Sequence, residues 1–155
     1  MRRWQAAHQR VVPELPLRWM LPIRGNERRL SLALKDYLQL DRGSRRCLGL
    51  FAAAGELGFG FVHAAPPSLY LENLDPNLLA RFGLSPEGAE HAPDVLVRVP
   101  TARESVFRAA VLRDGVPVAD ILQVWLDVAA HPARGAAQAK EIRHRALSLI
   151  FNERA

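Results

Sequence analysis

The chain has 155 residues, of which 49% are hydrophobic and 24% are charged, and this composition is typical of one folded globular domain. It has no run of about eighteen apolar residues that could span a membrane, and its N-terminus has no apolar segment of signal-peptide type. The single cysteine, Cys47, excludes an internal disulfide. These features together favour a cytoplasmic protein.

The charge is basic, with a formal net value of +5 and nineteen arginines against two lysines. A basic surface favours nucleic acid as a partner, but it equally suits an acidic protein. The net charge therefore leaves the partner open.

The first half of the chain begins with residues 1–25, which contain prolines, arginines and two tryptophans without regular periodicity. We expect an irregular N-terminal arm there, followed by a domain over residues 26–155. Apolar residues recur at helical spacing over residues 27–40, which predicts a helix. A second helix is predicted over residues 45–57, with Gly58 just beyond its end.

The middle of the chain predicts strands on either side of Pro66-Pro67, over residues 59–65 and 68–72. In the second strand, Tyr70 is expected on the face opposite Leu69 and Leu71. Asp75-Pro76 has the order of a helix N-cap followed by proline at the first helical position. We expect that helix to end near Phe82.

Alternating valines predict another strand over residues 94–99, and a short turn or helix is expected over residues 101–107. Asp114-Gly115 is a strong hairpin signal, because a type I′ turn needs positive φ at both central positions. A strand over residues 116–118 should follow this turn.

The stretch after the hairpin predicts a buried helix, because its apolar residues nearly encircle the axis. Asp120 fits its N-cap, and Pro132 should stop it. Its polar residues, Asp120, Gln123 and Asp127, fall on one stripe. A buried carboxylate requires a partner, and we expect an ion pair between Asp127 and Arg134. The alternative interpretation of this stripe is a recognition surface.

The last helix is predicted over residues 136–151. Its expected buried residues are Ala139, Ile142, Ala146, Leu149 and Ile150, and its expected exposed residues are Lys140, Arg143 and His144. The order of elements indicates an α/β or α+β domain, with helices packed on one mixed sheet and two consecutive helices at the C-terminus.

No motif for catalysis, cofactor binding or metal binding emerges from the sequence. The five histidines lack zinc-site spacing, and no phosphate-binding glycine loop or serine-nucleophile elbow is present. Pro93-Asp94 precedes a strand, as in metal-dependent nucleases of the restriction-endonuclease type, but the Glu-x-Lys expected on the next strand is missing. We therefore predict a protein that is not an enzyme, with no cofactor and no metal.

A possible basic binding surface contains residues near the N-terminus and on the last helix. Its members are Arg24, Arg28, Arg29, Lys140 and Arg143. It lacks interleaved aromatic residues, so a solvated helix face is the alternative interpretation.

The stretch of residues 116–135 resembles the C-terminal domain of the AbiEi family of bacterial antitoxins, which belong to type IV toxin–antitoxin systems. Three short segments carry the resemblance: residues 116–123 (Val-Pro-Val-Ala-Asp-Ile-Leu-Gln), 124–128 (Val-Trp-Leu-Asp-Val) and 131–135 (His-Pro-Ala-Arg-Gly). Upstream, residues 46–58 resemble the family's Ala- and Gly-bearing helix, and residues 68–71 resemble the strand after it. The likeness covers residues 28–150.

This resemblance implies an antitoxin that counteracts a nucleotidyltransferase-like toxin through a functional link without a stable complex. In the family, an N-terminal winged helix binds DNA as a transcriptional regulator. Here the match starts near residue 28, which leaves no room for a winged helix, and Pro-Ala-Arg134-Gly135 replaces a full Gly-Arg-Gly. The structure-critical residues are expected to be Asp120, Gln123, Trp125, Asp127, Arg134 and Gly135. The alternatives are a basic nucleic-acid-binding protein and, less favoured, a degenerate restriction-endonuclease-like nuclease.

Overall fold

The computed structural model describes residues 14–19, 27–40, 43–60, 62, 65–85 and 93–151. In this part of the chain, seven strands form one mixed sheet in the order β4-β1-β5-β3-β2-β7-β6. The pairs β3–β5 and β2–β7 are parallel, and the other neighbours are antiparallel. The strands are β1 (Glu14–Trp19), β2 (Arg46–Gly49), β3 (Ser68–Leu71), β4 (Leu84–Ser85), β5 (Val95–Arg98), β6 (Val111–Arg113) and β7 (Val116–Val118).

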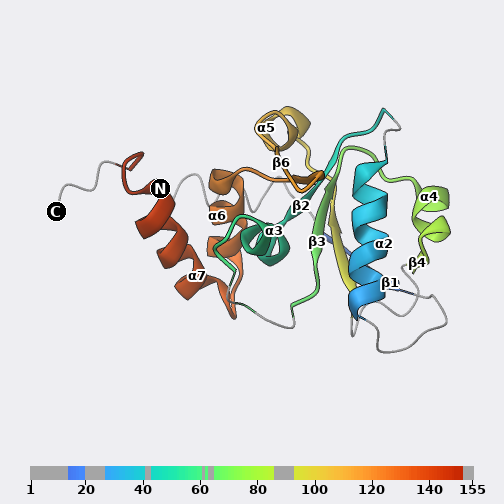
Figure 1. The fold of residues 1–155 in the computed structure, drawn as a ribbon, viewed down its shortest axis with the longest axis horizontal. Coiled ribbons are helices and arrows are strands. Elements are labelled where there is room, and N and C mark those ends of the chain that lie inside the picture. Colours follow the sequence, from blue (N-terminus) through green and yellow to red (C-terminus); the bar gives the residue numbers. More distant parts are fainter. Residues whose placement is uncertain are drawn as a thin grey trace.

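Helices cover both sides of this sheet, and the predicted fold class, α/β with one mixed sheet, is confirmed. Figure 1 shows α6 and α7 on one side of β2 and β3, and α2 and α4 on the other. The helices are α2 (Glu27–Gln39), α3 (Leu50–Glu56), α4 (Pro76–Arg81), α5 (Arg103–Phe107), α6 (Ile121–Ala130) and α7 (Gly135–Ile142), and a π-helical turn, η1 (Arg143–Leu147), follows α7. None of the helices in the described residues is long and apolar enough to cross a bilayer.

Helix α2 confirms the helical periodicity of residues 27–40. Leu34, Tyr37 and Leu38 are buried and belong to the main core. The same helix contacts β2 and β7. The apolar stripe therefore fixes which face of α2 packs on the sheet.

Local capping signals are also confirmed. The Asp75 carboxylate accepts a hydrogen bond from the backbone N–H of Leu78 at 3.1 Å, and Pro76 is the first residue of α4. At the central hairpin, Asp114 and Gly115 have φ values of +48° and +78°, as a type I′ turn requires. Asp120 then caps α6 by accepting from the N–H groups of Leu122 and Gln123.

The predicted irregular arm is wrong for residues 14–19, which form β1. This strand pairs with β5 and β4, although Pro16 lies within it as the register partner of Leu96. Its partners come from residues 84–98, and such distant pairing leaves no trace in local periodicity. The rest of residues 1–25 lies outside the described part of the chain.

The second predicted helix begins too early, because residues 46–49 form strand β2. All four of its residues are buried, and periodicity cannot distinguish so short an apolar run from a helix. The end of the helix was predicted correctly, with Gly58 in the left-handed region at φ +82°. The strand predicted over residues 59–65 is wrong at its described positions (59, 60, 62 and 65), which lie in irregular backbone.

The last helix changes its buried face at the π-helical turn. Ala139 and Ile142 are buried as expected, but Leu149 and Ile150 are 92% and 64% exposed, and Leu147 is buried in their place. A π turn contains about one residue more than an α turn, so it rotates every later side chain relative to the predicted stripe. The α-helical pattern therefore fails after Ile142.

Candidate functional site

The most distinctive site is a buried polar cluster between the sheet and α6, which we call the Asp127 cluster: Tyr70, Arg98, Gln123 and Asp127. On the side of the sheet, the cluster is built on adjacent positions of three neighbouring strands. Tyr70 on β3 is the register partner of Cys47 on β2 and of Arg98 on β5. Gln123 and Asp127 project from α6 one helical turn apart, at a spacing of i and i+4. The sheet and the helix thus supply two residues each.

Asp127 is the acceptor that joins this cluster. Its Oδ1 accepts from the Tyr70 hydroxyl at 2.6 Å, from Nη1 of Arg98 at 3.0 Å and from Nε2 of Gln123 at 3.1 Å. The Gln123 amide also lies 3.0 Å from the Tyr70 hydroxyl oxygen. The Asp127 side chain is fully buried, and that of Arg98 is 12% exposed. A carboxylate in such a position is stable only because its charge is paired and its oxygens are hydrogen-bonded.

The second oxygen of Asp127 holds the start of α3. Its Oδ2 accepts from the backbone N–H of Leu50 at 3.2 Å. Leu50 is the first residue of α3 and has a φ of +50°, a left-handed conformation that costs about 1–2 kcal/mol for a residue with a side chain. The N-cap residue, Gly49, has no side chain to satisfy this N–H. Asp127 therefore serves as a distant cap for α3.

Gly49 brings β2 close enough to the cluster for this contact. A Cβ atom at Gly49 would lie 2.9 Å from the Tyr70 ring and 3.4 Å from Oδ2 of Asp127. Real Cβ atoms rarely approach a ring so closely, so a larger residue would displace Tyr70. Glycine at position 49 therefore leaves room for the Tyr70 ring beside the Asp127 carboxylate.

Burial and the Asp127 charge both favour the protonated forms of Tyr70 and Cys47. Burial raises the pKa of the Tyr70 hydroxyl, and the nearby Asp127 charge raises it further. Burial also raises the pKa of the Cys47 thiol, again with a contribution from Asp127. Both groups therefore keep their protons, and the charges of the cluster are those of Asp127 and Arg98.

The ion pair predicted for Asp127 involved the wrong arginine. The structure pairs Asp127 with Arg98 on β5, whereas Arg134 lies exposed at the N-cap of α7, where its backbone N–H faces Nδ1 of His131. Arg98 is 29 residues from Asp127, and its position on an alternating strand was the available sequence signal. Tyr70 was missed as well: we placed it on the face opposite Leu69 and Leu71 but gave it no role, and the strand is buried on both faces.

The other residues predicted to be structure-critical lie at or near α6. Trp125 is buried, and its ring centroid lies 5.4 Å from that of Phe151. Gly135 begins α7, and a Cβ atom there would lie 1.7 Å from the carbonyl oxygen of Val128. The corner between α6 and α7 therefore accepts only glycine at this position.

The residues of the predicted basic surface come from separate elements. Lys140 is exposed on α7, while Arg143 is half-buried in η1. Arg28 and Arg29 lie in the first turn of α2, where their side chains fall outside the described part of the structure, as does all of Arg24. Figure 1 shows α2 and α7 apart, with α3 and α6 between them.

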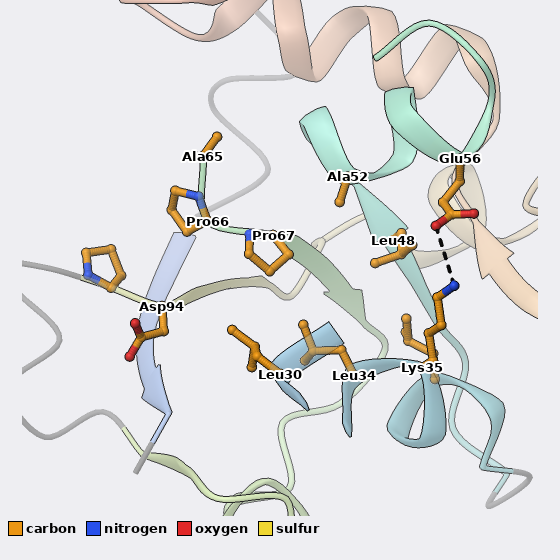
Figure 2. A pocket seen from close by; sticks show the side chains of 12 residues that line it. Leu30, Leu34, Lys35, Leu48, Ala52, Glu56, Ala65, Pro66, Pro67 and Asp94 are labelled. Atoms are coloured by element: carbon orange, nitrogen blue, oxygen red, sulfur yellow. Dashed lines mark ion pairs between the residues drawn. The ribbon is translucent and has the colours of Figure 1, made fainter. Parts of the chain in front are cut away.

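A separate pocket of about 450 Å³ lies between α2 and α3. Figure 2 shows aliphatic side chains along it, including Leu30, Leu34 and Leu48, and an ion pair at its rim between Lys35 and Glu56, whose charged atoms are 3.9 Å apart. Asp94, the residue considered in the nuclease interpretation, lines the same pocket. The pocket has a mixed lining of apolar and polar surface, with the Lys35–Glu56 ion pair at its margin.

The described residues contain no group of three His, Cys, Asp or Glu side chains placed to hold a metal ion. Comparison of the chain with family models, curated proteins and solved structures found no match.

Proposed function

We propose that this protein is a non-enzymatic, antitoxin-like regulatory domain similar to the C-terminal domain of AbiEi antitoxins. It would counteract a nucleotidyltransferase-like toxin without forming a stable complex with it. The observation that carries the proposal is the Asp127 cluster. Gln123 and Asp127 belong to the segments that resemble the family, and both meet Tyr70, from the upstream strand that also resembles it.

The three segments of the resemblance act together in this fold. Asp120 starts α6, Asp127 ties α6 to β3, β5 and α3, and Gly135 permits the tight corner to α7. These residues thus have structural roles in this fold. Their roles support the interpretation that the resemblance reflects a fold shared with the family.

The chemistry of the cluster also favours a scaffold over catalysis. Both oxygens of Asp127 accept hydrogen bonds from the protein, and the side chain is fully buried. A general base or metal ligand needs an oxygen that can reach a substrate or an ion. The binding activity of such a domain would therefore reside on its surface.

Growth rescue tests the proposal directly. The chain would be co-expressed with a toxic nucleotidyltransferase-like protein, encoded next to it or taken from a related system. We expect growth to recover, and we expect recovery to be lost with Asp127→Ala, which removes the shared partner of α3, β3 and β5.

The matched control is Asp36→Asn, which changes an equal charge at an exposed position on α2. It should rescue as well as the unaltered protein. Absence of rescue by a chain whose circular dichroism and cooperative unfolding show it to be folded would contradict the antitoxin proposal.

Nucleic-acid binding is the second candidate function. Lys140, His144 and Arg145 are exposed near the end of α7, although Arg145 also pairs with Glu141 and lies over the Phe59 ring. Binding through phosphate contacts predicts a steep loss of affinity as salt rises from about 50 to about 200 mM. Neutralising Lys140 and Arg143 together should reduce that salt dependence, and an affinity independent of salt would exclude this candidate.

A further inference from the structure

Arg46 carries a buried charge on the side of the sheet that packs against α2, where it contacts Tyr37. It is 6% exposed and lies on β2, where its guanidinium stacks over the Tyr37 ring at 4.9 Å. Nε and Nη2 donate to the carbonyl oxygen of Ser44, and Nη1 donates to that of Tyr37. No carboxylate in the described residues forms an ion pair with it.

These bonds leave part of the guanidinium unused. Arginine has five N–H donors, and three are engaged with carbonyl oxygens. One N–H on each Nη nitrogen therefore has no acceptor within the described structure. Neighbouring Nη donors suit the two oxygens of a carboxylate or phosphate group.

A pocket of about 300 Å³ lies beside this guanidinium, and we call it the Arg46 pocket. Its polar lining consists of Tyr37, Ser44, Arg46, Asn73, Asp75, Asn77 and Arg81. The Asp75 carboxylate faces the backbone N–H of Leu78, which it caps. Two arginines and one aspartate give the lining a net charge of +1. The volume is at the small end of the range for ligand sites.

We propose that the Arg46 pocket binds an oxyanion, namely the carboxylate or phosphate group of a small molecule. Arg46 supplies the buried charge and Arg81 supplies a second cation at the rim. The amides of Asn73 and Asn77 add neutral donors that orient the group. This proposal is independent of the antitoxin function, because it uses none of the residues of the Asp127 cluster.

An NMR titration tests the site with defined probes. Sodium phosphate, sodium acetate and sodium chloride would be added to separate samples at matched ionic strength. We expect saturable shifts of the Arg46 Nε–Hε signal and of the Asn73 and Asn77 side-chain amides with phosphate, acetate or both, and none with chloride. Saturation by phosphate alone assigns a phosphate ligand, and saturation by acetate alone assigns a carboxylate.

Three variants distinguish binding in the Arg46 pocket from a general effect of charge. Arg81→Gln should weaken anion binding by about tenfold, the factor that corresponds to losing one charge-assisted contact. Arg113→Gln removes the same charge from the exposed strand β6 and should leave the affinity unchanged. Arg46→Lys, if folded, should abolish binding, because lysine lacks the paired donors.

Three results would overturn the proposal. The first is an equal response to chloride, which would mean a nonspecific ionic effect. The second is the same loss of affinity in Arg81→Gln and Arg113→Gln. The third is the absence of any saturable shift with both oxyanions. None of these readings requires Arg46→Lys to fold, so the test remains decisive if that variant does not.

Discussion

The hydroxyl oxygen of Tyr70 lies 2.6 Å from Oδ1 of Asp127, and this bond joins the middle of the sheet to α6. Tyr70 and Asp127 are both buried, so neither can exchange this partner for water without opening the core. The bond therefore couples the packing of α6 to the integrity of β3.

Replacing Asp127 by alanine should lower the free energy of unfolding by about 3–5 kcal/mol, because it removes the buried acceptor that Tyr70, Arg98 and Gln123 share. Urea unfolding followed by circular dichroism measures this change. Asp36→Asn, at an exposed position on α2, should change the free energy by less than about 0.5 kcal/mol. A loss below about 1 kcal/mol for Asp127→Ala would mean that the cluster contributes little to stability.

Replacing Tyr70 by phenylalanine should lower the free energy of unfolding by about 1–3 kcal/mol, since it removes the hydroxyl that donates to Asp127 and accepts from Gln123. Combining it with Asp127→Asn in a double-mutant cycle should give a coupling energy of about 0.5–3 kcal/mol. Additive effects of the two substitutions would contradict a direct contact.

Glycine-to-alanine substitutions at two positions should have opposite effects. At Gly135 the new Cβ would overlap the Val128 carbonyl oxygen, and we expect a destabilisation of about 1–3 kcal/mol or more. At Gly55, in α3, a Cβ would meet nothing within 4 Å, and alanine should stabilise the helix by about 0.5–1 kcal/mol. Thermal unfolding of both variants measures whether each one is stabilised or destabilised. Equal effects would contradict the close contact at the corner between α6 and α7.

Alkaline pH should destabilise the protein. Burial raises the pKa of Tyr70 and Cys47 above their ordinary values of 10.0 and 9.0, so the unfolded chain releases these protons at a lower pH than the folded one. Their contribution is intact below about pH 9 and declines above it, by about 1.4 kcal/mol per group for each pH unit beyond the ordinary pKa.

The slope should become shallower in Tyr70→Phe and in Cys47→Ala, when the free energy of unfolding is measured between about pH 7 and about pH 11. Burial shifts the pKa of Tyr37 in the same direction, so each substitution removes only part of the slope. An unchanged slope in both variants would locate the alkaline sensitivity elsewhere.

Leu147 and Leu149 distinguish the π-helical turn from a continuous α-helix. Leu147→Ala should cost about 2–5 kcal/mol because the side chain is fully buried, whereas Leu149→Ser should be nearly neutral because that side chain is 92% exposed. Urea unfolding measures both. If Leu149→Ser were more destabilising than Leu147→Ala, the helix would bury the face that the sequence pattern predicts.

Local signals predicted the parts of this fold that are stabilised locally. The helix of residues 27–40, the caps at Asp75 and Asp120 and the turn at Asp114-Gly115 all depend on residues within about four positions of each other. The strands β1 and β2 were missed because their partners are distant in sequence. The same limit applied to the site, where Asp127 was recognised as a buried carboxylate but its partners, Tyr70 and Arg98, were not.

The order of the residues along the chain also determines when the Asp127 cluster can form during synthesis. Tyr70 and Arg98 leave the ribosome before Asp127, and Leu50, the first residue of α3, is synthesised 77 residues before the carboxylate that caps it. At a synthesis rate of about 5–20 residues per second, Asp127 follows Leu50 after several seconds. A nascent chain stalled before α6 would therefore lack the carboxylate that joins Tyr70, Arg98 and the start of α3, which makes such intermediates natural clients for chaperones.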